Sequence, residues 1–431
     1  MTVAFLSLFF GLITGSVPVE LSVDGPAAAV EIVVDGRPAG RLPGPPWKGR
    51  INFGHALLPH GIVARALNAE GHEVGRAEEW VNLPHPPAKV EIALEASGGG
   101  PPKAAKVVWT NLTGDVPRSV ALSFDGLPVK LDAQGRGELP PHDLKSIHIL
   151  TAQVDFLPDK TVRRDLAYGG EYGTEVATEL TGVPVKARSG KVPPAARLAG
   201  WITAAGKPLA VDAVEEGPGK LYIVCAASTS EIDGKMGQTG HLIEDIRYEM
   251  RLGRQDQIRF VPTVPERISS SGELSDLFQI TPPSGYEAGG LLWLLRRIGP
   301  HRVPDQQRIA DAVATAGLAA VNENRRRAVL LVLSGHEKDA SRYDPATVRR
   351  FLATLRVPLY VWSLGRAEPG SAAAAWGARD VTWTQHLYEA ARQIRDELDA
   401  QRIVMVDGRH LPQSIALSPA ATGVELVDSA P

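Results

Sequence analysis

The sequence has 431 residues, of which 44% are hydrophobic and 22% charged, and its formal net charge is −3 at pH 7. A chain this long exceeds one ordinary hydrophobic core, so we expect about two to four domains. The small net charge gives no indication of a nucleic-acid or anionic-membrane partner. The single cysteine, Cys225, excludes an intrachain disulfide. Because no histidine or aspartate motif accompanies it, we interpret Cys225 as a small buried hydrophobe.

Residues 1–18 have the composition of a secretory signal peptide. An apolar run at 3–13 is followed by small residues at 14–16, the pattern that precedes a signal-peptidase site. No lysine or arginine precedes Arg37, so the usual positive flank is missing. A membrane anchor is the alternative, although the run is short for a span. We expect cleavage near Ser16, a secreted, periplasmic or cell-envelope location, and no membrane insertion after cleavage.

Residues 19–84 alternate between apolar and polar side chains as β-strands do. Val30, Ile32 and Val34 fall on one face of a strand, which ends at an Asp-Gly pair at 35–36. Asp-Gly between alternating segments is a strong hairpin signal. Several short strands at near-regular spacing predict a small immunoglobulin-like β-sandwich over this region.

A second β region follows a proline-rich break at 83–87. Residues 90–94 alternate in the same way, and an Asp-Gly pair at 125–126 repeats the earlier turn. We therefore predict a second β-sandwich domain over residues 86–184. Residues 182–198 are rich in proline, lysine and glycine, and we interpret them as a linker.

One stretch has the pattern of a buried strand and the loop that leaves it. Residues 221–225 are apolar without alternation, as in a strand covered on both faces, and small residues follow as far as Ser230. This layout is typical of a βα loop at the carboxyl edge of a parallel sheet, where open α/β folds bind ligands. Apolar runs at 328–334 and 357–364 predict further strands. We interpret the basic run at 325–327 as a solvated helix end.

This stretch resembles the first strand of a von Willebrand factor A domain, whose Asp-x-Ser-x-Ser motif holds a divalent metal. Laid on that motif, Ser228 and Ser230 match the two serines, but Ala226 stands at the aspartate. Tyr286 replaces the family's metal-site threonine, and Gly335 replaces its second aspartate. Hard cations need anionic oxygen ligands. The resemblance therefore implies a degenerate metal-ion-dependent adhesion site that holds no metal.

The resemblance also implies a multidomain fold. The immunoglobulin-like β-sandwich segments precede an α/β three-layer von Willebrand factor A-like domain over residues 195–400. A C-terminal β hairpin or tail is expected over residues 401–431. The whole chain resembles a group of secreted bacterial proteins, common in Acidobacteria, that place β-sandwich segments before a divergent A domain.

The sequence carries no motif of nucleophilic, zinc or phosphate-loop catalysis, so we expect neither an enzyme nor a cofactor. We expect a protein that binds a protein partner of unknown identity through the loops at Ser228, Ser230, Tyr286 and Gly335. The alternative is a metal-dependent adhesion module in which nearby carboxylates replace the missing ligands. The acids near this edge are Glu231, Asp233, Glu287, Glu337 and Asp339. We favour the first reading because loop acids are more often solvated charges than converging ligands.

Overall fold

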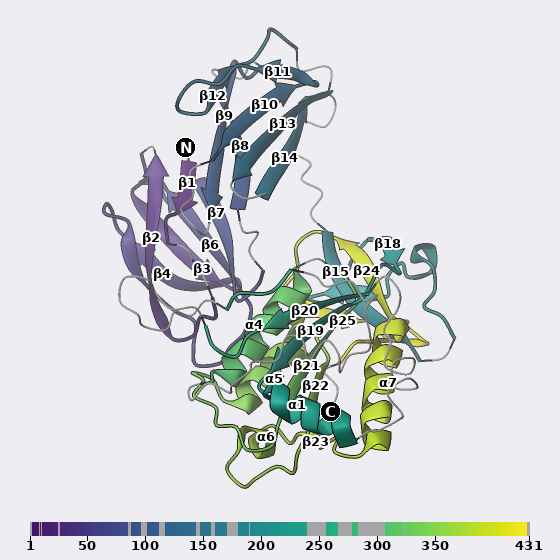
Figure 1. The fold of residues 1–431 in the computed structure, drawn as a ribbon. Coiled ribbons are helices and arrows are strands. Elements are labelled where there is room, and N and C mark those ends of the chain that lie inside the picture. Colours follow the sequence, from purple (N-terminus) through teal and green to yellow (C-terminus); the bar gives the residue numbers. More distant parts are fainter. Residues whose placement is uncertain are drawn as a thin grey trace. The chain divides into compact units, whose positions relative to one another are not determined.

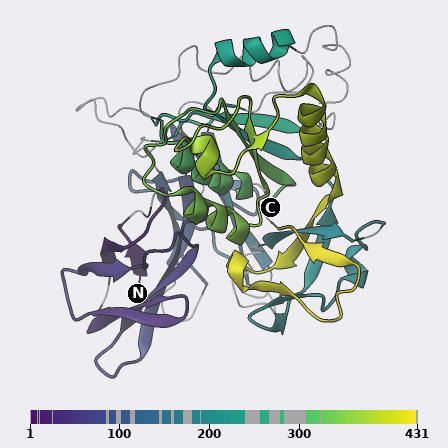
Figure 2. The same ribbon diagram turned by 90° about the horizontal axis from the view of Figure 1, so that it is seen from below.

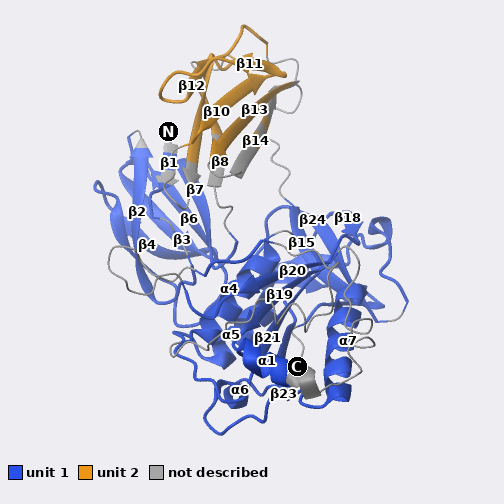
Figure 3. Ribbon diagram, in the orientation of Figure 1, with its two compact units in different colours: residues 1–84, 180–431 blue, residues 85–179 orange. Residues whose placement is uncertain are grey.

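The described chain divides into two compact units, residues 1–84 with 180–431 and residues 85–179 (Figure 3). No helix among the described residues is long and apolar enough to cross a bilayer. The computed structural model describes residues 2–7, 9, 11–24, 26–84, 88–95, 101–111, 117–143, 147–156, 160–169, 180–188, 190–238, 256–265, 278–282, 307–322 and 324–428.

The N-terminal part of the larger unit is a β-sandwich of a three-stranded and a four-stranded sheet (Figure 1). Its strands are β1 (Thr2–Phe5), β2 (Ser16–Asp24), β3 (Ala29–Val34), β4 (Arg37–Leu42), β5 (Lys48–Asn52), β6 (His60–Leu67) and β7 (Glu73–Val81). The sheet orders are β1-β2-β5 and β4-β3-β6-β7. Every second residue of β6 is buried, because successive side chains of a strand point to opposite faces. Ile32, Ile51 and Ile62 from the two sheets meet in one core.

The Asp-Gly turn predicted at the end of β3 is confirmed. Asp35 and Gly36 have φ angles of 49° and 78°, as a two-residue hairpin with both central residues left-handed requires. The Asp35 carboxylate also reaches the start of β6. Its Oδ1 accepts a hydrogen bond from Gly61 N at 2.9 Å, and its Oδ2 lies 2.7 Å from His60 Nδ1.

The first residues of the chain belong to this sandwich. β1 pairs with β2 as an antiparallel strand, and Val3 and Phe9 are only 8% and 4% exposed. The Asn82 side chain accepts from Ile13 N at 2.7 Å and donates to Ile13 O at 2.8 Å. In the uncleaved chain this segment therefore completes a sheet and its core. Cleavage by a signal peptidase stays a prediction.

The smaller unit is a second sandwich. Its strands are β8 (Ala88–Glu95), β9 (Ala104–Asn111), β10 (Ser119–Phe124), β11 (Leu127–Val129), β12 (Arg136–Glu138), β13 (Ile147–Phe156) and β14 (Lys160–Gly169). The sheet orders are β12-β9-β8 and β11-β10-β13-β14. In both sandwiches the first, second and fifth strands form one sheet, and the other strands form the second sheet. With this shared topology both sandwiches are immunoglobulin-like, and it explains why their sequence patterns are similar.

The similarity extends to side chains at the Asp-Gly turn. Asp125 and Gly126 have φ angles of 48° and 80°. Asp125 Oδ1 accepts a hydrogen bond from Ile149 N at 2.7 Å, and Oδ2 lies 2.7 Å from His148 Nδ1. The aspartate–histidine pair of the first sandwich thus recurs in the second, at the same place between the third and sixth strands.

A small β lobe is built from segments that flank the α/β layer in the sequence. Its strands are β15 (Leu180–Ala187), β16 (Ile202–Ala204), β17 (Lys207–Pro208), β18 (Val211–Glu215), β24 (Gln401–Asp407), β25 (Ile415–Leu417) and β26 (Val424–Leu426). Two short 3₁₀ turns, η1 (Ala195–Arg197) and η3 (Pro412–Ser414), accompany them. The sheet orders are β18-β24-β15-β26 and β17-β16-β25.

The lobe corrects three expectations. The linker expected at 182–198 begins as a paired strand, β15. The residues after 400 do not form a local hairpin, because β24 pairs with β15 and β18 while β25 pairs with β16. Strands β16 to β18 belong to this lobe and not to an α/β domain that begins at 195. Because the paired strands are far apart in the sequence, the local hydrophobic pattern does not indicate which strands pair with each other.

The remaining part of the larger unit is a five-stranded parallel sheet in the order β20-β19-β21-β22-β23. Its strands are β19 (Lys220–Cys225), β20 (Gln257–Val261), β21 (Arg327–Leu333), β22 (Leu359–Ser363) and β23 (Arg379–Asp380). The described helices are α1 (Thr229–Gln238), α4 (Ile309–Val321), α5 (Pro345–Thr354), α6 (Ala372–Ala375) and α7 (Thr384–Ala400). The three predicted strands are confirmed, and β19 lies inside the sheet.

Helices cover both faces of this sheet, as Figure 2 shows. Ile223 of β19 packs in the cluster that contains Ile394 of α7, whereas its neighbour Val224 packs in the cluster that contains Val313 of α4 and Phe351 of α5. Both faces of β19 are therefore buried, which is why its sequence is apolar without alternation. The expected three-layer α/β arrangement is present, flanked by the β lobe.

The basic run at the start of β21 differs from its prediction. Arg327 is the first residue of the strand and only 2% exposed, so it is no solvated helix end. Arg326 forms an ion pair in which its Nη2 lies 3.2 Å from Asp256 Oδ1. The prediction failed because a cluster of charges normally indicates a surface, and nothing local shows that these side chains turn inward.

Candidate functional site

The loop after β19 places the two predicted serines together. Ser228 Oγ lies 2.9 Å from Ser230 Oγ, at the carboxyl edge of the sheet where α1 begins. Glu231 Oε2 accepts hydrogen bonds from Ser228 N at 2.6 Å and from Ser228 Oγ at 2.8 Å. Ser228 Oγ in turn accepts from Glu231 N at 3.3 Å. This reciprocal arrangement is a capping box, which satisfies backbone donors at a helix start.

The second oxygen of Glu231 engages the neighbouring loop. Glu231 Oε1 lies 3.3 Å from Nε2 of His336, a residue of the loop that follows β21. His336 Nδ1 is 3.2 Å from Ser334 Oγ. The imidazole of His336 therefore stands against the carboxylate from the first loop, so a side chain of the protein contacts the acid that is nearest to the two serines.

The loop after β21 is shaped by Gly335 and Glu337. Both Glu337 carboxylate oxygens accept backbone hydrogen bonds, Oε1 from Ser334 N and Oε2 from Gly335 N at 3.0 Å. Gly335 has a φ of 120°, and a Cβ there would lie 2.5 Å from Arg366 O. The glycine at the family's second aspartate position is thus required by the close approach of the next loop.

The other acids considered as substitute ligands lie apart from the serines or outside the described residues. Asp339 accepts from Ile309 N at 2.9 Å and from Ala310 N at 3.1 Å, which places it at the start of α4. Burial raises the pKa of its carboxyl group. Asp233 is exposed on α1. Tyr286 and Glu287 lie outside the described residues.

The serine hydroxyls and the carboxylates of Glu231 and Glu337 at this edge already form hydrogen bonds within the protein. In the described part of the chain, no three or more His, Cys, Asp and Glu side chains are grouped so as to hold a metal ion. Cys225 is buried as expected, and burial raises the pKa of its thiol to about 12. A thiol with so high a pKa is a poor nucleophile at neutral pH. Among the described residues of these loops, the hydroxyl and carboxylate groups of Ser228, Ser230, Glu231 and Glu337 are thus bonded to other groups of the protein.

The sequence contained a signal for the helix start that the family resemblance obscured. Ser228-Thr-Ser-Glu231 fits the capping-box pattern, in which the acid at the third helical position bonds back to the cap. The same two serines also match the metal motif, so one pattern had two explanations. The role of His336 had no sequence signal, because it depends on the contact between two loops.

No family model matches the sequence, and no curated protein matches it. Among solved structures, fibronectin(III)-like modules of Clostridium thermocellum CbhA match 39% of this chain and 93% of theirs, at 13% identity and a TM-score of 0.16. The central fibronectin-III array of RIM-binding protein matches 44% of this chain and 80% of its own, at 12% identity and a TM-score of 0.23.

A beta-glycosidase from Bacteroides vulgatus matches 39% of this chain and 24% of its own, at 16% identity and a TM-score of 0.21. TM-scores this low carry no argument about fold or activity. The strand orders described above define the class by themselves: a multidomain, β-rich protein with two immunoglobulin-like sandwiches and a parallel α/β layer.

Proposed function

We propose that this chain is a non-enzymatic protein of the cell envelope or the secreted fraction that binds a protein partner without metal. The binding surface is the carboxyl edge of a divergent von Willebrand factor A-like layer. The observation that carries the proposal is the side-chain network of Ser228, Ser230, Glu231 and His336. In it, hydroxyls and a carboxylate that would otherwise face a cation are bonded to each other and to an imidazole.

Metal chemistry supports the same proposal. Mg²⁺ gives up its water reluctantly and needs carboxylate ligands in return. Glu231 and Glu337 are the acids nearest to the two loops, and both hold backbone N–H groups of their own loops. If a cation pulled either carboxylate away from its loop, those donors would lose their partners, which costs about 1–3 kcal/mol for each buried donor. The alternative adhesion module with substituted ligands must overcome this cost.

The test is calorimetric titration and thermal melting of the full chain with Mg²⁺ or Ca²⁺. We expect no saturable heat and no shift in melting temperature at millimolar metal. A ligand at about 100 times its Kd would stabilise the fold by about 2.7 kcal/mol, which a melt resolves readily. A clear stabilisation that disappears in the Ser228→Ala, Ser230→Ala double variant would establish the metal-dependent alternative instead.

Partner binding is tested by capture from the native cell envelope with the full chain as bait, with and without chelator. We expect the same partner protein in both samples. His336→Ala should weaken its capture, because it removes an exposed side chain that joins the two loops. As a matched control, His386→Ala changes an exposed histidine on α7, away from these loops. Capture that needs a divalent metal, or that is equal for both variants, would contradict the proposal.

A further inference from the structure

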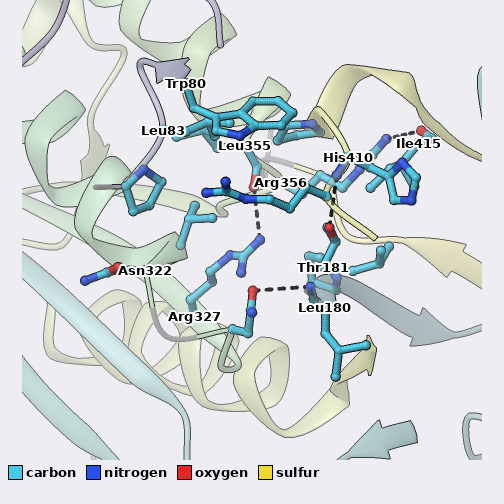
Figure 4. A pocket seen from close by; sticks show the side chains of 18 residues that line it. Trp80, Leu83, Leu180, Thr181, Asn322, Arg327, Leu355, Arg356, His410 and Ile415 are labelled. Atoms are coloured by element: carbon cyan, nitrogen blue, oxygen red, sulfur yellow. Dashed lines mark hydrogen bonds between the residues drawn. The ribbon is translucent and has the colours of Figure 1, made fainter. Parts of the chain in front are cut away.

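A cavity of about 180 Å³ lies in the larger unit, on the side of the parallel sheet where the strands begin (Figure 4). It is therefore separate from the loops at the carboxyl edge. The end of the first sandwich, the α/β layer and the β lobe all contribute to its wall. Its apolar wall includes Trp80, Leu83, Leu355 and Ile415.

Arg327 lines this cavity with a buried guanidinium group that is only partly bonded. The side chain rises from the first position of β21 and is 2% exposed. Its Nη2 donates to Leu355 O at 3.1 Å. Its Nε and Nη1 are buried and have no hydrogen-bond partner among the residues that the structure describes. A buried guanidinium with two unused donors is costly, because desolvation is not repaid.

Arg356 brings a second guanidinium to the same cavity. It follows α5 with a φ of 53°, and its Nη2 donates to Ile415 O at 2.9 Å. Its Nε is buried without a hydrogen-bond partner in the described part of the chain. Figure 4 shows the side chains of Arg327 and Arg356 extending toward the same space. The indole Nε1 of Trp80, on the wall of the same cavity, also has no hydrogen-bond partner among the described residues.

Arg326, which precedes Arg327 in the sequence, forms ion pairs with acids that the two cavity arginines lack. Arg326 forms ion pairs with Asp256 and Asp399, at 3.2 Å and 3.6 Å. Neither Arg327 nor Arg356 has an ion pair with an acid of the described chain. Burial and the charge of Arg356 lower the pKa of Arg327 to about 10. Two positive groups in one buried place repel each other, and an anion between them would offset this repulsion.

We propose that this cavity binds a small organic anion, whose carboxylate or phosphate group is held by Arg327 and Arg356 and whose apolar body lies against the wall at Leu83 and Leu355. Guanidinium groups bind both oxyanions through parallel N–H donors, which explains why arginines stand here and not lysines. The wall combines apolar residues with polar ones, which include Asn322, Arg409 and His410, and small-molecule sites likewise join an apolar surface to a few polar groups. This site is independent of the function proposed for the carboxyl edge.

The experiment is calorimetric titration of the full chain with phenyl phosphate, benzoate and inorganic phosphate, at an ionic strength held constant with chloride. Benzylamine, a cation of similar shape to benzoate, is the control. We expect saturable binding of at least one organic anion and none of benzylamine. Phenyl phosphate and benzoate distinguish a phosphate ligand from a carboxylate ligand. No saturable heat with any of the three anions at millimolar concentration would overturn the proposal.

Variants tie the binding to the cavity. Arg356→Gln removes a charge-assisted hydrogen bond to the anion and should weaken anion binding about 10-fold or more. Arg350→Gln, which removes the same charge from an exposed position of α5, should leave binding unchanged. Equal effects of the two variants would mean non-specific charge attraction and would overturn the proposal.

Arg327→Met separates a ligand site from a structural role. Replacing a buried charge by an apolar side chain of similar length is often neutral or stabilising. We expect the variant to melt at the parent temperature or above and to lose anion binding. A strong destabilisation would show that Arg327 is structural and would overturn its assignment.

Asp428 is the acid whose charge acts on Arg356. If the chain fills its own site with this carboxylate, only Asp428→Asn would bind the anions and the parent would not. That result would overturn the proposal that the cavity binds an external anion.

Discussion

Gly335 stands at a position where the structure admits no side chain. Its φ of 120° suits glycine alone, and the place of a Cβ is already taken by Arg366 O. An aspartate there would meet the same backbone atom as an alanine. The absence of a side chain at this position is therefore linked to how tightly the two loops pack, which the sequence by itself does not reveal.

We predict that Gly335→Ala destabilises the larger unit by more than about 1 kcal/mol, since alanine is incompatible with this φ and meets Arg366 O. The measurement is urea unfolding of the full chain. Gly370→Ala is the matched control, because Gly370 has a φ of 79° and nothing within 4 Å of the Cβ position. If both variants lose equal stability, the loop contact contributes nothing beyond backbone strain.

His148 and Asp125 should make the stability of the second sandwich depend on pH. The hydrogen bond to Asp125 raises the pKa of His148 above its ordinary 6.5. Burial opposes ionisation of Asp125, but the bonds from His148 and Ile149 outweigh it and hold its pKa below 3.8. The histidine contribution is complete below pH 6.5 and is lost as the pH rises through the raised value. The aspartate contribution is complete above pH 3.8 and is lost as the pH falls through the lowered value.

The pair should therefore stabilise the sandwich most between the two ordinary pKa values. His148→Asn should cost more stability near pH 5 than near pH 8, as measured by chemical unfolding of residues 85–179 at each pH. In an Asp125→Asn background the same substitution should show a smaller difference, because only Asp143 then raises the pKa of His148. A cost that is independent of pH in both backgrounds would mean that His148 contributes by packing alone.

At the residue scale, the sequence predicted which side chains lie in the loop after β19 but not what they bind. Ser228 and Ser230 are together, as the motif required. Their partner Glu231 is local and was recognisable as a capping residue. The inward turn of Arg327 was not recognisable, because it depends on a cavity between segments that are far apart in the sequence.

At the scale of elements, β1 is the strand whose place matters most for the biology. A chain that starts at Ser16 is what a signal peptidase would leave. It would lack β1 and the buried side chains of Val3 and Phe9. Burying such a side chain is worth about 1.5–3 kcal/mol, offset in part by the entropy of ordering the strand.

We predict that the chain starting at Ser16 unfolds at lower urea than the full chain. Leu6→Ser, in the same segment but 54% exposed, should change stability little. Mass spectrometry of the native N-terminus shows which form exists in the cell. Equal stability of both forms would contradict this prediction.

Strands of the α/β layer were easier to predict than strands of the β lobe. β19, β21 and β22 are apolar throughout because helices cover both faces, so each has a strong signal of its own. β15 contains a proline, and its partners β24 and β26 come near the end of the sequence. A proline-containing segment whose strand partners are more than 200 residues away resembles a linker in the sequence, although β15 lies inside its sheet.

At the scale of the whole molecule, the smaller unit has a core of its own. Leu122, Leu150 and Val154 belong to a cluster whose members all come from residues 90–166. We predict that an isolated polypeptide of residues 85–179 melts in one cooperative transition, as single domains of this size usually do. Leu150→Ala should lower its stability by about 2–5 kcal/mol, and exposed Leu127→Ala should not. A chain without cooperative melting would mean that this unit needs the rest of the protein.

The pairing of β15 with β24 sets an order of events during synthesis. β15 and β18 leave the ribosome before the α/β layer, but the strand that lies between them is made after it. Until residues 401–407 are synthesised, both strands expose unpaired backbone along the edges that β24 will fill, and such edges invite pairing with other chains. The nascent protein therefore has an interval in which the α/β layer can fold while its flanking lobe cannot close, and ribosome-bound chains that stall in this interval are the ones most in need of a chaperone.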